Sequence, residues 1–88
     1  MRRRRSYLEI IVDILGMGEA SQTRIIYEGG MNYHQAQRYL NFLVDIGFLE
    51  RVSGDHRTYY KPTERGKEFR ERVKPILNCL YGDGEIEL

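Results

Sequence analysis

Cysteine, tryptophan and proline are scarce in this 88-residue chain, which has one cysteine, no tryptophan and two prolines. With Cys79 alone, an intramolecular disulfide and a cysteine cluster for zinc are both excluded, and we expect no metal site. Two histidines are present, but no Ser/His/Asp grouping and no glycine-rich phosphate loop after a strand. We therefore expect a protein that is not an enzyme and that has no catalytic residues and no cofactor.

Long apolar runs are also missing, since none approaches the ~18 residues that a membrane span needs, and no membrane partner is expected. Arg2–Arg5 and the apolar residues after them superficially resemble a signal peptide, but Glu9 and Asp13 interrupt the apolar stretch. We expect a cytoplasmic, nucleoid-associated protein. The chain is also too short for two domains that each bury a core.

Charge of one sign is not in excess, because 14 Lys and Arg against 13 Asp and Glu leave a net charge of +1. The charges are segregated, however. Arg2–Arg5 open the chain without an acid, and the last seven residues hold Asp83, Glu85 and Glu87. This pattern predicts a basic N-terminal arm at 1–5, one domain at 6–81 and an acidic, flexible tail at 82–88.

The domain contains three short stretches with helical periodicity, and glycines separate them. Ser21 and Asn32 are good N-caps for the second and third stretch. The predicted helices span residues 6–15, 22–28 and 32–46. The apolar arc of the first helix covers more than half of its circumference, which indicates burial on two sides.

The pattern changes to strands after Gly47, with residues 48–52 and 57–61 joined by a turn. Thr63 caps a last helix that ends at about residue 81 and that Pro75 should kink. We therefore predict a mainly α fold with a small β-hairpin. This is a winged helix-turn-helix, with a three-helix core, a two-stranded wing and a C-terminal helix.

The helix at 32–46 carries the clearest functional signal. On an ideal helix its apolar residues share one arc, and the opposite arc is uncharged polar, aromatic or arginine. Asn and Gln side chains pair with adenine in the major groove, and Arg pairs with guanine. The predicted DNA-facing residues of this helix are Tyr33, His34, Gln37, Arg38 and Asn41.

Cations flank this helix on two sides. In the wing, at 52–58, Arg57 is the best candidate for the DNA backbone or minor groove, and Arg51 lies just before it. The predicted arm contributes phosphate contacts through Arg2, Arg3, Arg4 and Arg5.

Three stretches resemble the small archaeal winged-helix regulators, a group that includes the ArnR-like proteins and the archaeal chromatin-type winged-helix proteins. They are Arg4–Leu15 with Thr23–Tyr27, then Tyr39–Leu49, and Tyr59–Phe69, where a threonine cap precedes a glycine by one turn. The resemblance covers about residues 2–74. It implies a homodimer on double-stranded DNA, with the third helix in the major groove.

The last helix departs from the chromatin-type pattern, whose long C-terminal helix forms a coiled coil, because Pro75 interrupts it. We expect instead a compact dimer through the first helix and an apolar stripe on the last one. The predicted stripe consists of Phe69, Val73, Ile76, Leu77 and Leu80.

Two functions remain open from sequence. The first is a DNA-binding transcriptional regulator. The second is a protein-protein docking module that does not bind DNA, since fold does not fix function. The sequence indicates no small-molecule ligand, and so short a chain leaves little room for one.

Overall fold

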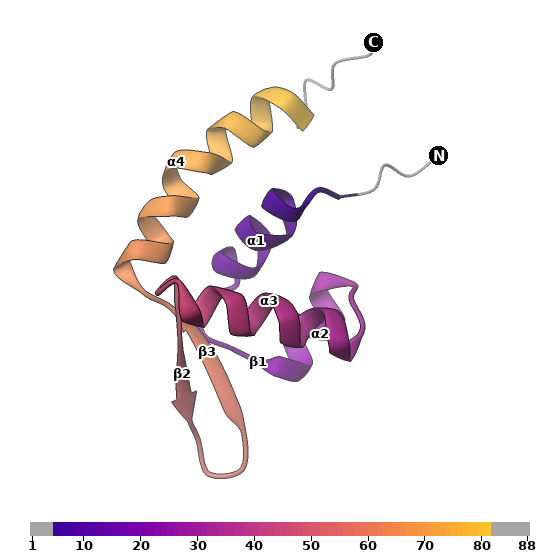
Figure 1. Cartoon of the computed structure of the whole chain (residues 1–88), viewed down its shortest axis with the longest axis vertical. Coiled ribbons are helices and arrows are strands. Elements are labelled where there is room, and N and C mark those ends of the chain that lie inside the picture. The colour runs from indigo at the N-terminus through magenta and orange to yellow at the C-terminus, as the bar shows by residue number, and fades with distance from the viewer. Residues whose placement is uncertain (1–4, 82–88) are drawn as a thin grey trace.

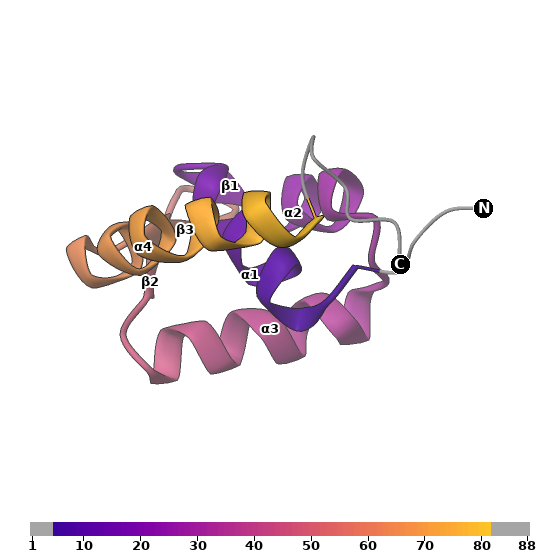
Figure 2. The same ribbon diagram turned by 90° about the horizontal axis from the view of Figure 1, so that it is seen from above.

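The computed structural model describes residues 5–81, and the predicted tail at 82–88 lies outside them. Its elements follow the predicted order of three helices, a hairpin and a last helix (Figure 1). They are α1 (Tyr7–Gly16), β1 (Ala20–Ser21), α2 (Gln22–Gly29), α3 (Tyr33–Asp45), β2 (Leu49–Ser53), β3 (Thr58–Pro62) and α4 (Glu64–Tyr81). The β2–β3 hairpin projects from the helices, and α1 lies between α3 and α4 (Figure 2).

The helix starts follow from side-chain caps. The Ser6 hydroxyl accepts from the Glu9 amide at 3.2 Å, and the Glu9 carboxylate accepts from the Ser6 amide at 2.8 Å. Asn32 forms the same reciprocal box with Gln35 before α3. Each box satisfies amides that a helix start would otherwise leave without partners. The predicted caps Ser21 and Asn32 are thus confirmed.

The sheet has three strands rather than the predicted two, in the order β1-β3-β2. Ala20 and Ser21 pair with Tyr60 and Tyr59 of β3. A strand of two residues has no alternation of apolar and polar side chains, so periodicity does not detect it. The pairing also turns one tyrosine of β3 inward: Tyr60 is 4% exposed, and Tyr59 is half-buried.

The core lies where the three short helices meet the sheet. Its largest fully buried side chains are Ile14 of α1, Ile25 of α2, and Leu40 and Leu43 of α3. Within residues 5–81, no helix combines the length and the apolar character needed to cross a membrane.

The start of α4 is fixed to the end of α3. The Thr63 hydroxyl donates to the Gly47 carbonyl at 2.6 Å and accepts from the Gly66 amide at 3.1 Å. The Thr63 amide donates to the Phe48 carbonyl at 3.0 Å. A Cβ at Gly66 would overlap that same carbonyl, so this close approach of two backbones requires glycine.

The apolar stripe predicted on α4 does not form one surface. Phe69 packs on Phe48 with ring centroids 4.7 Å apart, and Leu77 is buried in the fold. Ile76 and Leu80 are 58% and 48% exposed. Part of the stripe is buried because α1 lies against α4, as Figure 2 shows for the two ribbons, and the dimer contact itself stays a prediction. Pro75 lies inside α4, which curves in Figure 1.

Candidate nucleic-acid interface

The exposed face of α3 holds the polar residues that the sequence assigned to DNA. Tyr33, His34, Arg38 and Asn41 are exposed, and Gln37 is half-buried. Ala36, Leu40 and Leu43 occupy the opposite, buried face. The Tyr33 ring meets the His34 ring edge-on, with centroids 6.0 Å apart. The helix therefore offers amide, imidazole and guanidinium donors on one exposed surface.

A hydrogen bond joins this surface to β2, next to the wing. The Arg51 guanidinium donates to the Asn41 side-chain oxygen at 2.6 Å, and it lies 5.9 Å from the centre of the Tyr60 ring. Two residues predicted separately, one in α3 and one in β2, are thus in contact. The bond orients the Asn41 amide, whose NH2 group remains to donate to an acceptor on a base edge.

A hollow of about 580 Å³ separates the start of α2 from the wing. Arg57, the predicted wing contact, lies in it, and Arg24 lines it from α2. Arg24 also pairs with Glu28 at 2.6 Å. The remaining lining residues are Ser21, Gln22, Thr23, Tyr27, His56 and Thr58. Helix-start amides, hydroxyls and guanidinium groups are the groups that bind phosphate.

Sequence reasoning missed the contribution of α2 to this hollow. Gln22 and Thr23 directly follow the Ser21 cap, where a helix start leaves amides without helical partners, and Arg24 comes next, with its amide donating to the Ser21 hydroxyl. That local signal is present in the sequence. Their proximity to the wing depends on the pairing of β1 with β3, which was not predicted.

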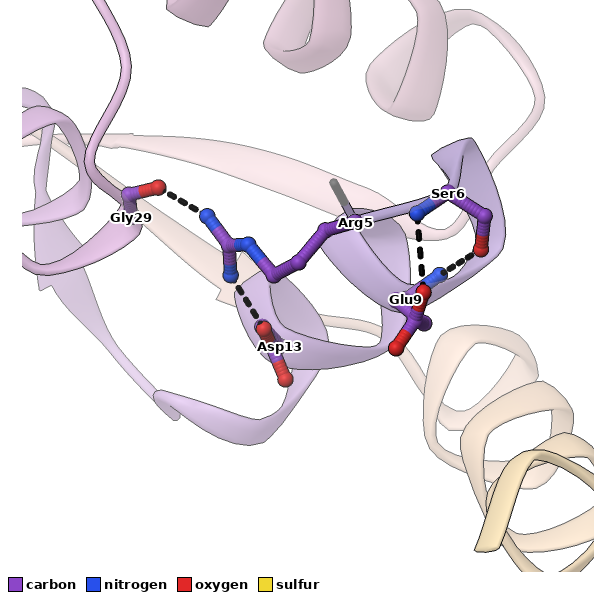
Figure 3. A network of polar contacts seen from close by, with 5 residues as sticks. All are labelled: Arg5, Ser6, Glu9, Asp13 and Gly29. Atoms are coloured by element: carbon purple, nitrogen blue, oxygen red, sulfur yellow. Dashed lines mark hydrogen bonds and ion pairs between the residues drawn. The ribbon is translucent and has the colours of Figure 1, made fainter. Parts of the chain in front are cut away.

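Arg5 does not belong to a free arm, contrary to prediction. Its guanidinium forms an ion pair with Asp13 and donates to the Gly29 carbonyl (Figure 3). It therefore links α1 to the end of α2. The sequence did not reveal this, because Gly29 lies 24 residues away along the chain. Arg2, Arg3 and Arg4 lie outside the described residues.

Three packed helices, a turn before an exposed polar helix, and a following hairpin define a winged helix-turn-helix domain. The chain belongs to the winged helix-turn-helix family, whose sequence model matches residues 4–80. The predicted fold and the predicted family resemblance are both confirmed.

Two archaeal proteins are similar over most of their length. An uncharacterised protein of Methanocaldococcus jannaschii, MJ0287, is 31% identical over 82 residues, which cover 90% of this chain and 80% of that protein. The crystal structure of Sso10a-2, described as a DNA-binding protein from Sulfolobus solfataricus, superposes with a TM-score of 0.78. That match has 36% identity and covers 85% of this chain and 81% of Sso10a-2.

The fold is also that of a MarR family transcriptional regulator from Silicibacter pomeroyi. The TM-score is 0.74 at 22% identity, and the match covers 91% of this chain and 56% of the regulator. At this identity the comparison supports the fold alone.

Proposed function

We propose that this protein binds double-stranded DNA and regulates transcription. In this proposal α3 enters the major groove, and the wing at 52–58 contacts the backbone or minor groove. The observation that carries the proposal is the bond between Asn41 and Arg51, which sets the polar face of α3 beside the wing. The similarity to Sso10a-2, at 36% identity, supports it.

The residues divide between base reading and backbone contact. Tyr33, His34, Gln37, Arg38 and Asn41 face the bases from α3. Arg57 and Arg24 face phosphates from the hollow between wing and α2. Arg51 acts through Asn41, which it orients. We further propose that Arg2, Arg3 and Arg4 contribute sequence-independent phosphate contacts.

The proposal is tested by fluorescence anisotropy with random duplex DNA and with the promoter of the protein's own gene, each at two salt concentrations. A preference of ~10³-fold or more for the promoter is expected of a specific regulator. Similar affinity for both with a steep salt dependence would indicate an architectural DNA-binding protein instead. Absence of binding to either duplex at low salt would refute DNA binding and favour the docking module.

Replacing Asn41 by alanine should relax base preference at one position of the site. We expect a loss of about 1–3 kcal/mol for the preferred base and little change for the other three, because a direct contact to a base edge is lost. Anisotropy with duplexes substituted at single positions measures this. Glu68→Ala, on the exposed side of α4, is the control. A uniform loss over all sequences would instead assign Asn41 to the backbone.

We propose in addition that the protein is a homodimer, through the outer faces of α1 and α4. Leu8, Ile76 and Leu80 are large apolar side chains that remain exposed there. Exposed apolar side chains of this size favour burial against a partner. Two copies related by a two-fold axis would present two α3 helices to DNA, as half-sites require.

Ile76→Glu combined with Leu80→Glu is expected to give a monomer. Both side chains are about half exposed in one copy, so the fold should tolerate the change while a dimer would bury two charges without partners. Sedimentation velocity at tens of micromolar measures the mass, and Arg72→Glu is the charge-changing control. A wild-type monomer at that concentration would remove the dimer and the expectation of a two-fold DNA site.

A further inference from the structure

A groove of about 470 Å³ lies between α1 and α3, apart from the hollow near the wing. Its apolar lining comes from Ile11, Phe42 and the rings of Tyr7 and Tyr39, whose centroids are 5.8 Å apart. Tyr7 is 77% exposed and Phe42 is 51% exposed. Packing within residues 5–81 therefore leaves two aromatic rings open to solvent at the groove. The chain length predicts little room for an enclosed ligand cavity, and this groove is instead open to solvent at the surface.

The polar groups of the groove are all able to donate hydrogen bonds. Arg38 and Gln35 line it from α3. The Gln35 side-chain oxygen accepts from the Asn32 amide at 3.2 Å, which leaves its NH2 group to donate. Burial raises the pKa of Tyr39, as does the neighbouring Tyr7, whereas Arg5 lowers it. A tyrosine hydroxyl is protonated at neutral pH even without this shift, so Tyr39 can act as a donor.

The charge of the groove selects the sign of its occupant. None of the described residues that line it is acidic, and Arg38 supplies a positive charge. Within residues 5–81, Arg38 forms no ion pair, whereas Arg5, Arg24 and Arg72 do. Aromatic walls with one guanidinium group and several neutral donors match a flat apolar molecule that carries one carboxylate.

We propose that the groove binds a planar aromatic carboxylate. The carboxylate pairs with Arg38 and accepts from Gln35, and the ring system packs against Tyr7, Tyr39 and Phe42. The volume of about 470 Å³ is in the range of small-molecule sites, and stacking on aromatic side chains favours a flat ligand over a branched one.

Arg38 belongs to both the groove and the proposed DNA-binding face of α3. A carboxylate that occupies its guanidinium removes it from a base, so ligand and DNA compete for the same group. Linkage then requires the ligand to lower the affinity for DNA by the same factor by which DNA lowers the affinity for the ligand. This consequence rests on the proposed function, whereas binding of the carboxylate to the protein alone does not.

The first experiment uses 2-naphthoate as the probe and 2-naphthamide as its neutral analogue. Because the chain has no tryptophan, the fluorescence anisotropy of the probe can be followed directly, without DNA. We expect saturable binding of naphthoate and at least about tenfold weaker binding of the amide, since the charged hydrogen bond is lost. Equal affinity for both compounds, or no binding of naphthoate at millimolar protein, would overturn the proposal.

Two variants locate the site. Arg38→Gln should weaken naphthoate binding about tenfold or more and reduce the preference over the amide. Tyr7→Ala should weaken both compounds, because it removes an exposed aromatic wall without touching the core. Tyr81→Ala, which changes a tyrosine outside this groove, is the matched control. Unchanged binding to both groove variants would place the ligand elsewhere and refute the site.

The second experiment adds naphthoate to the complex with promoter DNA. Weaker DNA binding in wild type but not in Tyr7→Ala is the expected result. Naphthoate binding together with unaltered DNA affinity would confirm the site and refute the competition. Naphthoate binding by a protein that binds no DNA would leave the site standing and overturn the proposed function.

Discussion

Replacing Gly66 by alanine is expected to lower the free energy of unfolding by about 3 kcal/mol or more, although alanine normally stabilises a helix relative to glycine. The new Cβ would overlap the Phe48 carbonyl and lie 3.2 Å from Leu15. The obstacle is backbone, which no change of rotamer can remove. The helix must move away, which breaks the bonds that Thr63 makes to Gly47 and Phe48.

Thermal unfolding followed by circular dichroism measures this change, and a midpoint lowered by roughly 10–20 °C is expected for a domain of this size. Gly16→Ala is the matched control in another helix. The atoms nearest to its Cβ would be those at the end of the Arg70 side chain, which can move, so its midpoint should change by much less. A Gly66→Ala protein as stable as wild type would contradict the tight docking of α4.

Replacing Arg24 and Arg57 together by alanine is expected to weaken DNA binding about 100-fold or more at low salt. Both line the hollow between α2 and the wing, and each charged hydrogen bond to a phosphate that is lost costs about tenfold or more in affinity. The slope of log affinity against log salt should become shallower by about 1.8, because the two lost phosphate contacts no longer release counterions from the DNA. Because neither residue reads a base, the preference among sequences should remain.

Titrations over a range of salt concentrations separate this effect from the overall charge. Arg70 is excluded as a control, since its guanidinium packs beside Gly16. The double variant Arg65→Ala with Arg72→Ala on α4 also removes two positive charges, but away from the hollow. The salt slope of this variant should stay near that of wild type. If both double variants lose affinity equally, the loss reflects net charge, and the hollow is no phosphate site.

Local chemistry made most of the fold predictable. Ser21 and Asn32 are strong caps, and the glycines at 30 and 47 adopt positive φ where helices end. The hairpin pattern begins directly after Gly47. These signals depend on a few consecutive residues. The strand Ala20–Ser21 was not predictable in this way, because it exists only through pairing with Tyr59 and Tyr60 far along the chain.

The candidate site shows the same division. Helical periodicity by itself predicts that Arg38 and Asn41 lie on an exposed face of α3, and both side chains are exposed. It could not show that Asn41 meets Arg51, or that Arg38 also borders a groove completed by Tyr7. Each of these depends on how separate elements pack, and the spacing within one helix carries no information about that.

Ser21 serves two elements at once, because it caps α2 and pairs with Tyr59 in the sheet. Ser21 therefore attaches the start of α2 directly to β3 at the base of the wing. On the proposed function, this attachment limits how far the wing can shift to suit each duplex, so we expect the duplex to bend or change its groove width instead. Flexible TA and CA steps would then cost less to bind than stiff A-tracts, even at base pairs that no side chain touches. Selectivity would come partly from the mechanics of DNA.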